Sequence, residues 1–257
     1  DVAAITNEIV EEMLADEIVD GYTIEVETND GIVTLDGVTT DLISKERAER
    51  MAEIVRGVRA VVNQIRVDTE QISDRQLRNN VISALAYDAA TESYDIDVHV
   101  NDQVVTLTGT VDSWHESELA GYVVKSVQGV EKLVNNLDVD YEIDRSDADI
   151  RADITESLRW DTRVDDGLID VSVTDGEVFL SGTVGSAAEK RRARTDAWVA
   201  GVDEVNTEQL EVEGWARDEQ MRQDKYTDYT DEDIQQAIQD ALMYDPRVDD
   251  DHINVVV

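Results

Sequence analysis

Apolar and polar residues alternate in three short runs along the chain. Ile24, Ile96 and Ile169 each open a stretch in which every second residue is apolar, which is typical of a strand with one buried face. Each run is followed by a short turn and then by a second run of the same kind. The pattern therefore predicts three β-hairpins. Their turns are Asn29-Asp30-Gly31, Asn101-Asp102-Gln103 and Asp175-Gly176.

A glycine ends each second run and marks an internal repeat. Gly37, Gly109 and Gly182 are 72 and 73 residues apart, and each stands thirteen residues after the isoleucine that opens its unit. A polar residue with helix-capping character follows each glycine, namely Asp41, Ser113 or Ser186. We therefore predict a helix after each hairpin, running to a second glycine suited to a left-handed C-cap. These second glycines are Gly57, Gly129 and Gly201.

A further helix and a further strand complete each unit. Apolar residues at helical spacing precede every hairpin, as Ile5, Ile9 and Met13 do in the first unit. A third strand is expected at residues 61–67, 133–139 and 205–212, with one extra residue in the third copy. Each unit thus reads helix, strand, strand, helix, strand (αββαβ). The expected fold class is α+β, with two helices covering one face of a small three-stranded mixed sheet.

The predicted domains follow from this register. Repeat 1 spans residues 1–70, repeat 2 spans 73–143, and repeat 3 spans 146–213. Residues 214–229 form a polar linker, and residues 230–257 match only the first helix and first strand of a fourth copy, with Thr230 as the cap. One helix and one strand bury too little apolar surface to fold alone. We interpret the sequence as an excerpt of a longer protein, the alternative being completion by another chain.

The repeats resemble the BON-domain family, named for bacterial OsmY and nodulation proteins. The resemblance rests on Leu-Arg-Trp-Asp at 158–161, Asp-Gly-x-Val-x-Leu-x-Gly at 175–182, and the segment from Gly-Val to Asn-Asn-Leu at 129–137. It implies a helix-strand-strand-helix-strand module, usually in envelope or secreted proteins. It also implies association with phospholipid or membrane surfaces, with osmotic-stress protection and, in some members, with chaperone-like activity. Gln103 departs from the pattern by replacing the hairpin glycine, and we expect a local change of geometry there.

Net charge narrows the list of partners. The chain has 60 acidic and 22 basic residues, for a formal charge of −38. This excludes general binding to nucleic acid, which needs cationic side chains to neutralise phosphates, and it opposes docking on anionic lipid at low salt. The acidic residues are spread over every segment. We interpret this as adaptation to high salt, where charge repulsion is screened, with an acidic surface tuned only for solubility as the alternative.

The sequence contains few candidate catalytic or metal-binding groups. The three histidines occupy unrelated repeat positions, no nucleophile elbow or phosphate loop is present, and there are no cysteines. Aspartate clusters such as residues 249–251 do not have calcium-loop spacing. No apolar run approaches the ~20 residues that span a bilayer. We therefore expect no enzymatic activity, no cofactor, no metal site and no transmembrane segment.

Two features are candidates for contact with a surface or a partner. Four basic residues fall within five positions of repeat 3, namely Lys190, Arg191, Arg192 and Arg194. They could dock phosphate headgroups or an acidic partner, or instead pair with carboxylates of a neighbouring repeat. Trp114 opens a helix, where it could enter a membrane interface or a partner groove, or instead pack on its own sheet.

The leading hypothesis is a non-enzymatic binding and stress-protection protein that contacts phospholipid surfaces, envelope components or unfolded proteins. One alternative is a structural protein whose repeats assemble with one another or with another chain. Another is a sensor of potassium or osmolality. The resemblance implies a periplasmic or envelope location, whereas the charge is also compatible with the cytoplasm of a salt-accumulating cell.

Overall fold

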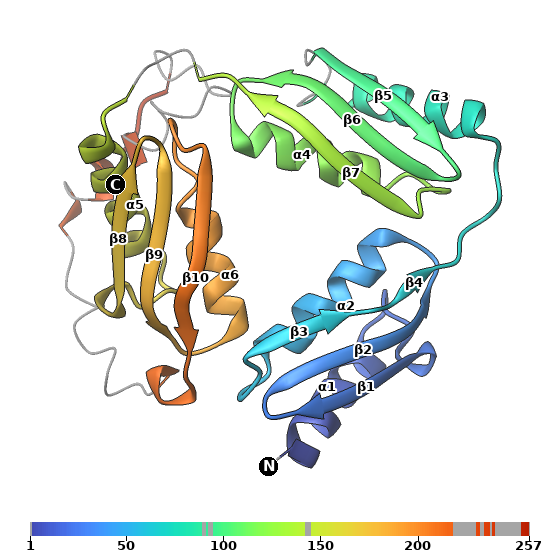
Figure 1. Ribbon diagram of the computed structural model, residues 1–257, viewed down its shortest axis with the longest axis horizontal. Coiled ribbons are helices and arrows are strands. Elements are labelled where there is room, and N and C mark those ends of the chain that lie inside the picture. Colours follow the sequence, from blue (N-terminus) through green and yellow to red (C-terminus); the bar gives the residue numbers. More distant parts are fainter. Residues whose placement is uncertain are drawn as a thin grey trace.

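The computed structural model describes residues 2–88, 91, 95–141 and 145–217, and also residues 230–231, 234–236, 238–239 and 253–256. Three αββαβ units follow one another (Figure 1), so the α+β fold class predicted from the sequence is confirmed. Repeat 1 contains α1 (Val2–Ala15), β1 (Ile24–Asn29), β2 (Ile32–Thr39), α2 (Leu42–Ile54), β3 (Ala60–Asn63) and β4 (Arg66–Val67). Repeat 2 contains α3 (Asp74–Tyr87), β5 (Asp95–Asn101), β6 (Val104–Val111), α4 (Trp114–Lys125) and β7 (Lys132–Val139). Repeat 3 contains α5 (Asp147–Trp160), β8 (Ile169–Thr174), β9 (Glu177–Val184), α6 (Ala187–Asp196) and β10 (Glu204–Val212).

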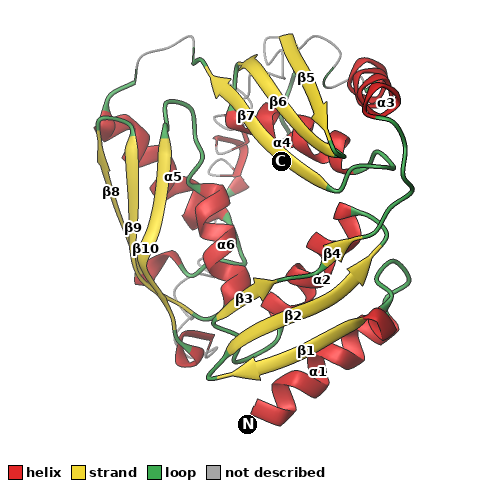
Figure 2. Cartoon of the chain, turned by 45° about the vertical axis from the view of Figure 1, so that its right-hand side comes forward, coloured by secondary structure: helices red, strands yellow, loops and turns green. Residues whose placement is uncertain are grey.

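Each sheet has the same topology. The first two strands form an antiparallel hairpin, and the third strand returns through the second helix to pair in parallel with the second, which leaves the second strand in the middle. The two helices lie on one face of the sheet (Figure 2). The inward residues of the central strand are fully buried against them, as Leu107 is in repeat 2 beside Leu77 and Ala120. Alternation along the strands therefore arises from this single core-facing side.

The hairpin turns share one conformation. In each turn both central residues have positive φ, as expected for a two-residue hairpin loop. Gln103 adopts a φ of 60° where the other repeats have glycine, and the strand register across its turn is the same as theirs. The local change of geometry expected at Gln103 is therefore not seen. Its amide Nε2 donates hydrogen bonds to the carbonyl oxygens of Glu70 and Gly129, each at 3.2 Å, and these contacts stabilise the buried side chain.

The second helices begin at the predicted caps but end early. The side chains of Asp41, Ser113 and Ser186 each accept a hydrogen bond from the backbone N–H three residues later. The helices end three to five residues before Gly57, Gly129 and Gly201, so the predicted extension to these glycines is wrong. All three glycines have positive φ in the turns that lead to the third strand.

The third strand differs between repeats. In repeat 1 the predicted strand 61–67 is divided into β3 and β4, because residues 64 and 65 leave the ladder. In repeat 3 the pairing shifts by one residue between Asn206 and Gln209, which forms a β-bulge. The bulge accommodates the extra residue found in the sequence of this copy.

Gly37, Gly109 and Gly182 stand where the hairpin strands approach most closely. Each pairs with the residue at the start of the first strand or one beyond it, and each has a φ between 116° and 137°. A Cβ at any of them would lie 2.1 Å from a backbone carbonyl oxygen, for example that of Asp95 in repeat 2. Both the backbone conformation and the contact therefore require glycine.

The three repeats close into a ring. In Figures 1 and 2 the helices α2, α4 and α6 face the centre, and the chain passes from repeat 1 through repeat 2 to repeat 3, which returns to lie beside repeat 1. Contacts between α2 and α6 join the first and third units. The ring is the structural context of the candidate site.

Little of the predicted linker and fourth copy lies within the described residues. Gly214–Arg217 form a short 3-10 helix at the start of the linker, and residues 218–229 lie outside the described part. The backbone N–H of Ile234 donates to the carbonyl of Thr230, and Gln235 Nε2 donates to the carbonyl of Val255 at 2.8 Å. Helical residue Gln235 therefore contacts residues 253–256, which form no assigned strand, so the strand predicted there stays a prediction. The predicted cap partner Asp233 and the aspartates at 249–251 fall outside the described residues.

Replacing Gly109 with alanine should destabilise the protein by at least about 2 kcal/mol, because the new Cβ meets a backbone carbonyl and the φ is left-handed. Chemical denaturation followed by circular dichroism measures the change. Gly214→Ala is the matched control, since no heavy atom lies within 4 Å of its added Cβ. Equal stability of the two variants would contradict the assigned role of Gly109.

Candidate functional site

The facing second helices enclose a groove of about 330 Å³ at the centre of the ring. Charged side chains and two tryptophans from all three repeats form its walls. The lining residues are Glu46, Glu49, Arg50 and Glu53 of α2, Trp114 and Glu118 of α4, and Arg191, Arg194, Thr195 and Trp198 on or just after α6. We call this the central groove.

Two ion pairs join the repeats at equivalent positions. Glu46 of repeat 1 contacts Lys125 of repeat 2 at 2.7 Å, and Arg191 of repeat 3 contacts Glu53 of repeat 1 at 2.5 Å. Both pairs connect the ninth residue after the repeat glycine with the sixteenth residue after the glycine of the next repeat. The same geometry is therefore used twice, with the signs of the charges exchanged.

The junction of repeats 2 and 3 uses aromatic rings instead of an ion pair. Trp114 stacks on Trp198 with the two rings nearly parallel and their centroids 5.2 Å apart. The rings of His115 and Trp114 are nearly perpendicular, at the same centroid distance. The sequence left Trp114 open between a membrane interface, a partner groove and its own sheet, and in the structure the ring packs on Trp198 of a neighbouring repeat. Stacking of this kind contributes about 0.5–1.5 kcal/mol beyond area burial.

The first residue of each second helix reaches the next unit around the ring. These residues are Leu42, Trp114 and Ala187, all five positions after their repeat glycine. Leu42 packs against the core of repeat 2, and Ala187 is buried in the core of repeat 1. Each second helix therefore covers its own sheet along its length and contacts the next repeat at its N-terminus.

The basic cluster of repeat 3 is distributed among several partners. Lys190 Nζ donates to the carbonyl of Leu210 at 2.7 Å, and burial lowers the pKa of this amine. Arg191 bridges to repeat 1 as described, which is the internal contact that the sequence left open, and Arg192 contacts Asp161 and Asp196 within its own repeat. Arg194 is exposed at the groove and has no ion pair with a described residue. The four residues predicted as a docking patch therefore leave one guanidinium open for contact.

Two of the carboxylates near Arg192 have opposite pKa shifts. Burial raises the pKa of Asp161, but hydrogen bonds from the Arg163 backbone N–H and from Arg192 outweigh it and lower the pKa to about 2. Burial and the neighbouring Asp161 charge raise the pKa of Asp196 to about 7, against the opposing charge of Arg192. Asp161 is thus the ionised partner of Arg192, whereas Asp196 keeps its proton below about pH 7 and releases it above.

The carboxylate that receives Arg191 is also perturbed. Burial raises the pKa of Glu53, and the Arg191 guanidinium opposes this shift. The Glu53 side chain is 12% exposed, whereas that of Arg191 is 45% exposed. The pair is therefore anchored on the repeat 1 side and open to solvent on the repeat 3 side.

Our sequence reasoning missed Glu46, Glu53, Lys125 and Trp198 as contact residues. Their signal was present in the repeat alignment, because all four fall nine or sixteen residues after a repeat glycine. Only the folded ring shows that these two positions meet.

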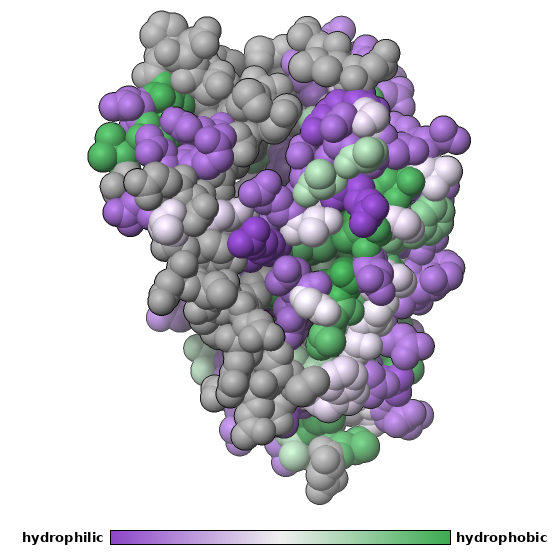
Figure 3. All heavy atoms as spheres, turned by 90° about the vertical axis from the view of Figure 1, so that its left-hand side faces the viewer, coloured by the Kyte–Doolittle hydropathy of each residue, from purple (hydrophilic) through white to green (hydrophobic). Residues whose placement is uncertain are grey.

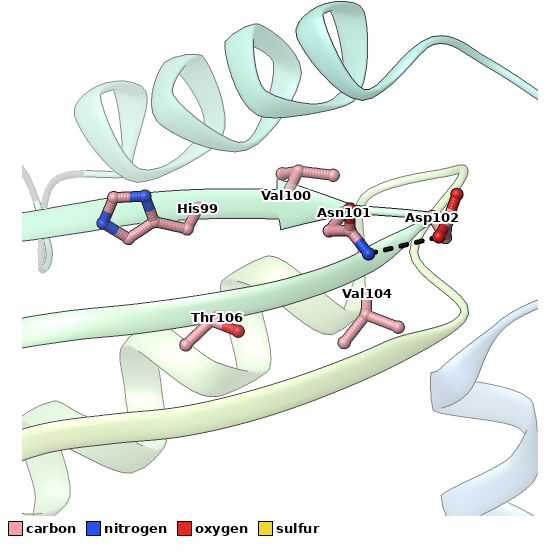
Figure 4. A pocket seen from close by; sticks show the side chains of 6 residues that line it. All are labelled: His99, Val100, Asn101, Asp102, Val104 and Thr106. Atoms are coloured by element: carbon pink, nitrogen blue, oxygen red, sulfur yellow. Dashed lines mark hydrogen bonds between the residues drawn. The ribbon is translucent and has the colours of Figure 1, made fainter.

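A second hollow lies on the repeat 2 hairpin (Figure 4). His99, Asn101, Val104 and Thr106 form its floor near the turn, and Asn101 donates to the Asp102 carboxylate at 3.2 Å. The hollow is open, and His99 is exposed on the outer face of the sheet.

No group of three or more metal-ligating side chains occurs within the described ranges. Among the described helices, none combines the length and the apolar character needed to cross a bilayer.

These observations define a tandem-repeat α+β protein held together by contacts between its repeats. The BON domain profile matches residues 1–69, 73–141 and 146–214, and the chain belongs to the BON-domain family. It is 30% identical over 144 residues to the osmotically-inducible protein Y of Escherichia coli, covering 53% of this chain and 72% of that protein.

Two solved structures of CdsD, a structural protein of the type III secretion system of Chlamydia trachomatis, are also similar, each at 15% sequence identity. The first comparison covers 80% of this chain and 91% of that one with a TM-score of 0.22. The second covers 83% of this chain and 100% of the CdsD C-terminal domain with a TM-score of 0.23. Structural similarity with TM-scores this low adds nothing to the family assignment.

The raised pKa of Asp196 predicts a pH-dependent stability. The native state keeps a proton that the unfolded chain releases above about pH 4, so this group's contribution to stability falls as pH rises toward 7. Asp196→Asn should remove this dependence and stabilise the protein at pH 8 by about 2 kcal/mol. Thermal unfolding of both proteins from pH 5 to pH 8 measures the difference. Asp170→Asn, at an exposed position, is the charge-matched control, and equal effects of the two substitutions would refute the assignment.

Proposed function

We propose that this protein is a non-enzymatic osmotic-stress protein whose BON repeats contact phospholipid surfaces. The observation that carries the proposal is the 30% identity with the osmotically-inducible protein Y over a segment spanning two repeats' length. The three BON matches support it, since the family resemblance implies association with membrane surfaces. Envelope proteins and unfolded proteins are the other partners in this class.

The charges of the described residues constrain how lipid would be bound. Each repeat is strongly acidic, and three of the four clustered basic side chains of repeat 3 contact internal acceptors. Figure 3 shows the side of the molecule nearest repeat 3, where hydrophobic and hydrophilic described residues are interspersed. Contact with an anionic surface is therefore expected to strengthen with salt, because screening reduces the repulsion between lipid and protein. Among the four clustered basic residues, Arg194 is the one left to meet a phosphate group.

Vesicle co-sedimentation tests the proposal. Phosphatidylglycerol and phosphatidylcholine vesicles are mixed with the protein at 0.05 M and 2 M sodium chloride, and the bound fraction is measured. We expect the bound fraction on anionic vesicles to rise with salt, and Arg194→Glu to lower it about fivefold. Arg151→Glu, an exposed residue of α5, makes the same charge change outside the groove and is the control. Absence of binding under every condition would reject lipid contact.

The contacts between repeats favour a second candidate, a structural interaction protein whose repeats assemble with one another. Ion pairs, a tryptophan stack and shared cores already join the three units within this chain. This function predicts no binding to either kind of vesicle, together with self-association detectable by analytical ultracentrifugation. Vesicle binding and self-association can both be measured on one preparation of the protein, and together they distinguish the two functions.

A further inference from the structure

We propose that the contact between repeat 3 and repeat 1 is a charge-selected docking surface that closes the ring and opens when ionic strength falls. The proposal concerns the repeats alone and does not depend on lipid binding. It rests on the geometry of the α2–α6 contact, on the order of charges around the ring, and on the net charge of each repeat.

The closing contact lacks a short covalent connection. Short segments join repeat 1 to repeat 2 and repeat 2 to repeat 3, whereas Arg191 and Glu53 are 138 residues apart in the sequence. The closing contact consists of this ion pair, of Ala187 buried in the core of repeat 1, and of the packing of α6 beside α2. It can therefore open while all three units stay folded and linked.

The charges specify which repeats meet. At the ninth and sixteenth positions the closing contact pairs Arg191 with Glu53, whereas the contact of repeats 1 and 2 pairs Glu46 with Lys125. If repeat 3 docked on repeat 2, Arg191 would face Lys125, and like charges at this separation repel. If a second copy of repeat 1 docked on repeat 1, Glu46 would face Glu53. At the two junctions that carry an ion pair, the observed order places opposite charges together.

Repulsion between whole repeats opposes closure. Residues 1–69 contain 16 acidic and 6 basic side chains, residues 73–141 contain 12 and 4, and residues 146–214 contain 17 and 7. Each unit is therefore strongly negative, and the ring holds three such units together. The repulsion acts between side chains spread over whole domains, across distances well beyond the Debye length of ≈ 8 Å at physiological salt.

Salt acts unequally on these two interactions. The Arg191–Glu53 nitrogen and oxygen are 2.5 Å apart, which is shorter than the Debye length of ≈ 3 Å even at 1 M, and Glu53 is largely shielded from solvent. Raising the salt concentration therefore removes the long-range repulsion and weakens the local pair much less. Lowering it to 0.01 M lengthens the Debye length to ≈ 30 Å, so that whole repeats repel one another.

Energy transfer between repeats 1 and 3 tests this proposal on the full chain. The protein has no cysteine, so Ala60→Cys and Ser172→Cys, both exposed and neutral, provide unique dye positions. We expect transfer efficiency to fall at least twofold between 1 M and 0.01 M sodium chloride, while far-UV circular dichroism stays constant. Efficiency that is unchanged, or that rises as salt is removed, overturns the proposal. Loss of circular dichroism in parallel with transfer also overturns it, because the change would then be unfolding.

Charge reversal tests whether the Arg191–Glu53 pair selects which repeats dock. Arg191→Glu should shift the salt concentration for half-closure at least threefold upward, and so should Glu53→Arg. Combining the two substitutions restores opposite charges and should return the midpoint toward that of the parent protein. Arg151→Glu makes the same charge change on an exposed part of repeat 3 and should shift the midpoint less than Arg191→Glu does. A double variant no better than the single ones, or equal shifts for Arg151→Glu and Arg191→Glu, would show that net charge alone governs closure.

Discussion

The register between the two hairpin strands is the constraint on which the rest of the molecule depends. The repeat glycine meets the start of the first strand so closely that a Cβ would lie 2.1 Å from a carbonyl oxygen. The second strand ends two residues after this glycine, and the second helix begins five residues after it. The strand pairing thus also determines which helix residues reach the next repeat.

Because the repeats share this register, equivalent positions recur at each junction, but their side chains differ. Leu42, Trp114 and Ala187 all begin a helix and all contact the next unit, through an aliphatic chain, an indole and a methyl group respectively. The ion pairs behave similarly, since Glu46–Lys125 and Arg191–Glu53 exchange signs at the same two positions. A common backbone with junction-specific side chains allows three similar domains to assemble in one order.

The fold could be predicted from the sequence because local patterns determine it. Alternation defined the strands, and the capping residues Asp41, Ser113 and Ser186 set the helix starts. The conformation of Gln103 could not be foreseen, because its αL backbone is supported by carbonyls of Glu70 and Gly129, distant in sequence. The candidate site was hidden for the same reason. Arg191 lies in an evident basic cluster, but its partner Glu53 belongs to another repeat and is identified only by the ring.

The acidic composition and the closed ring are connected by the range of the forces involved. A charge of −38 spread over every repeat acts at long range, whereas the ion pairs and the Trp114–Trp198 stack act at contact distance. Mobile ions shorten the range of the repulsion and weaken the contacts much less. Salt therefore selects the closed arrangement without binding at any particular site. An acidic tandem repeat can respond to the ionic strength of its surroundings although no metal-ligating cluster occurs among its described residues.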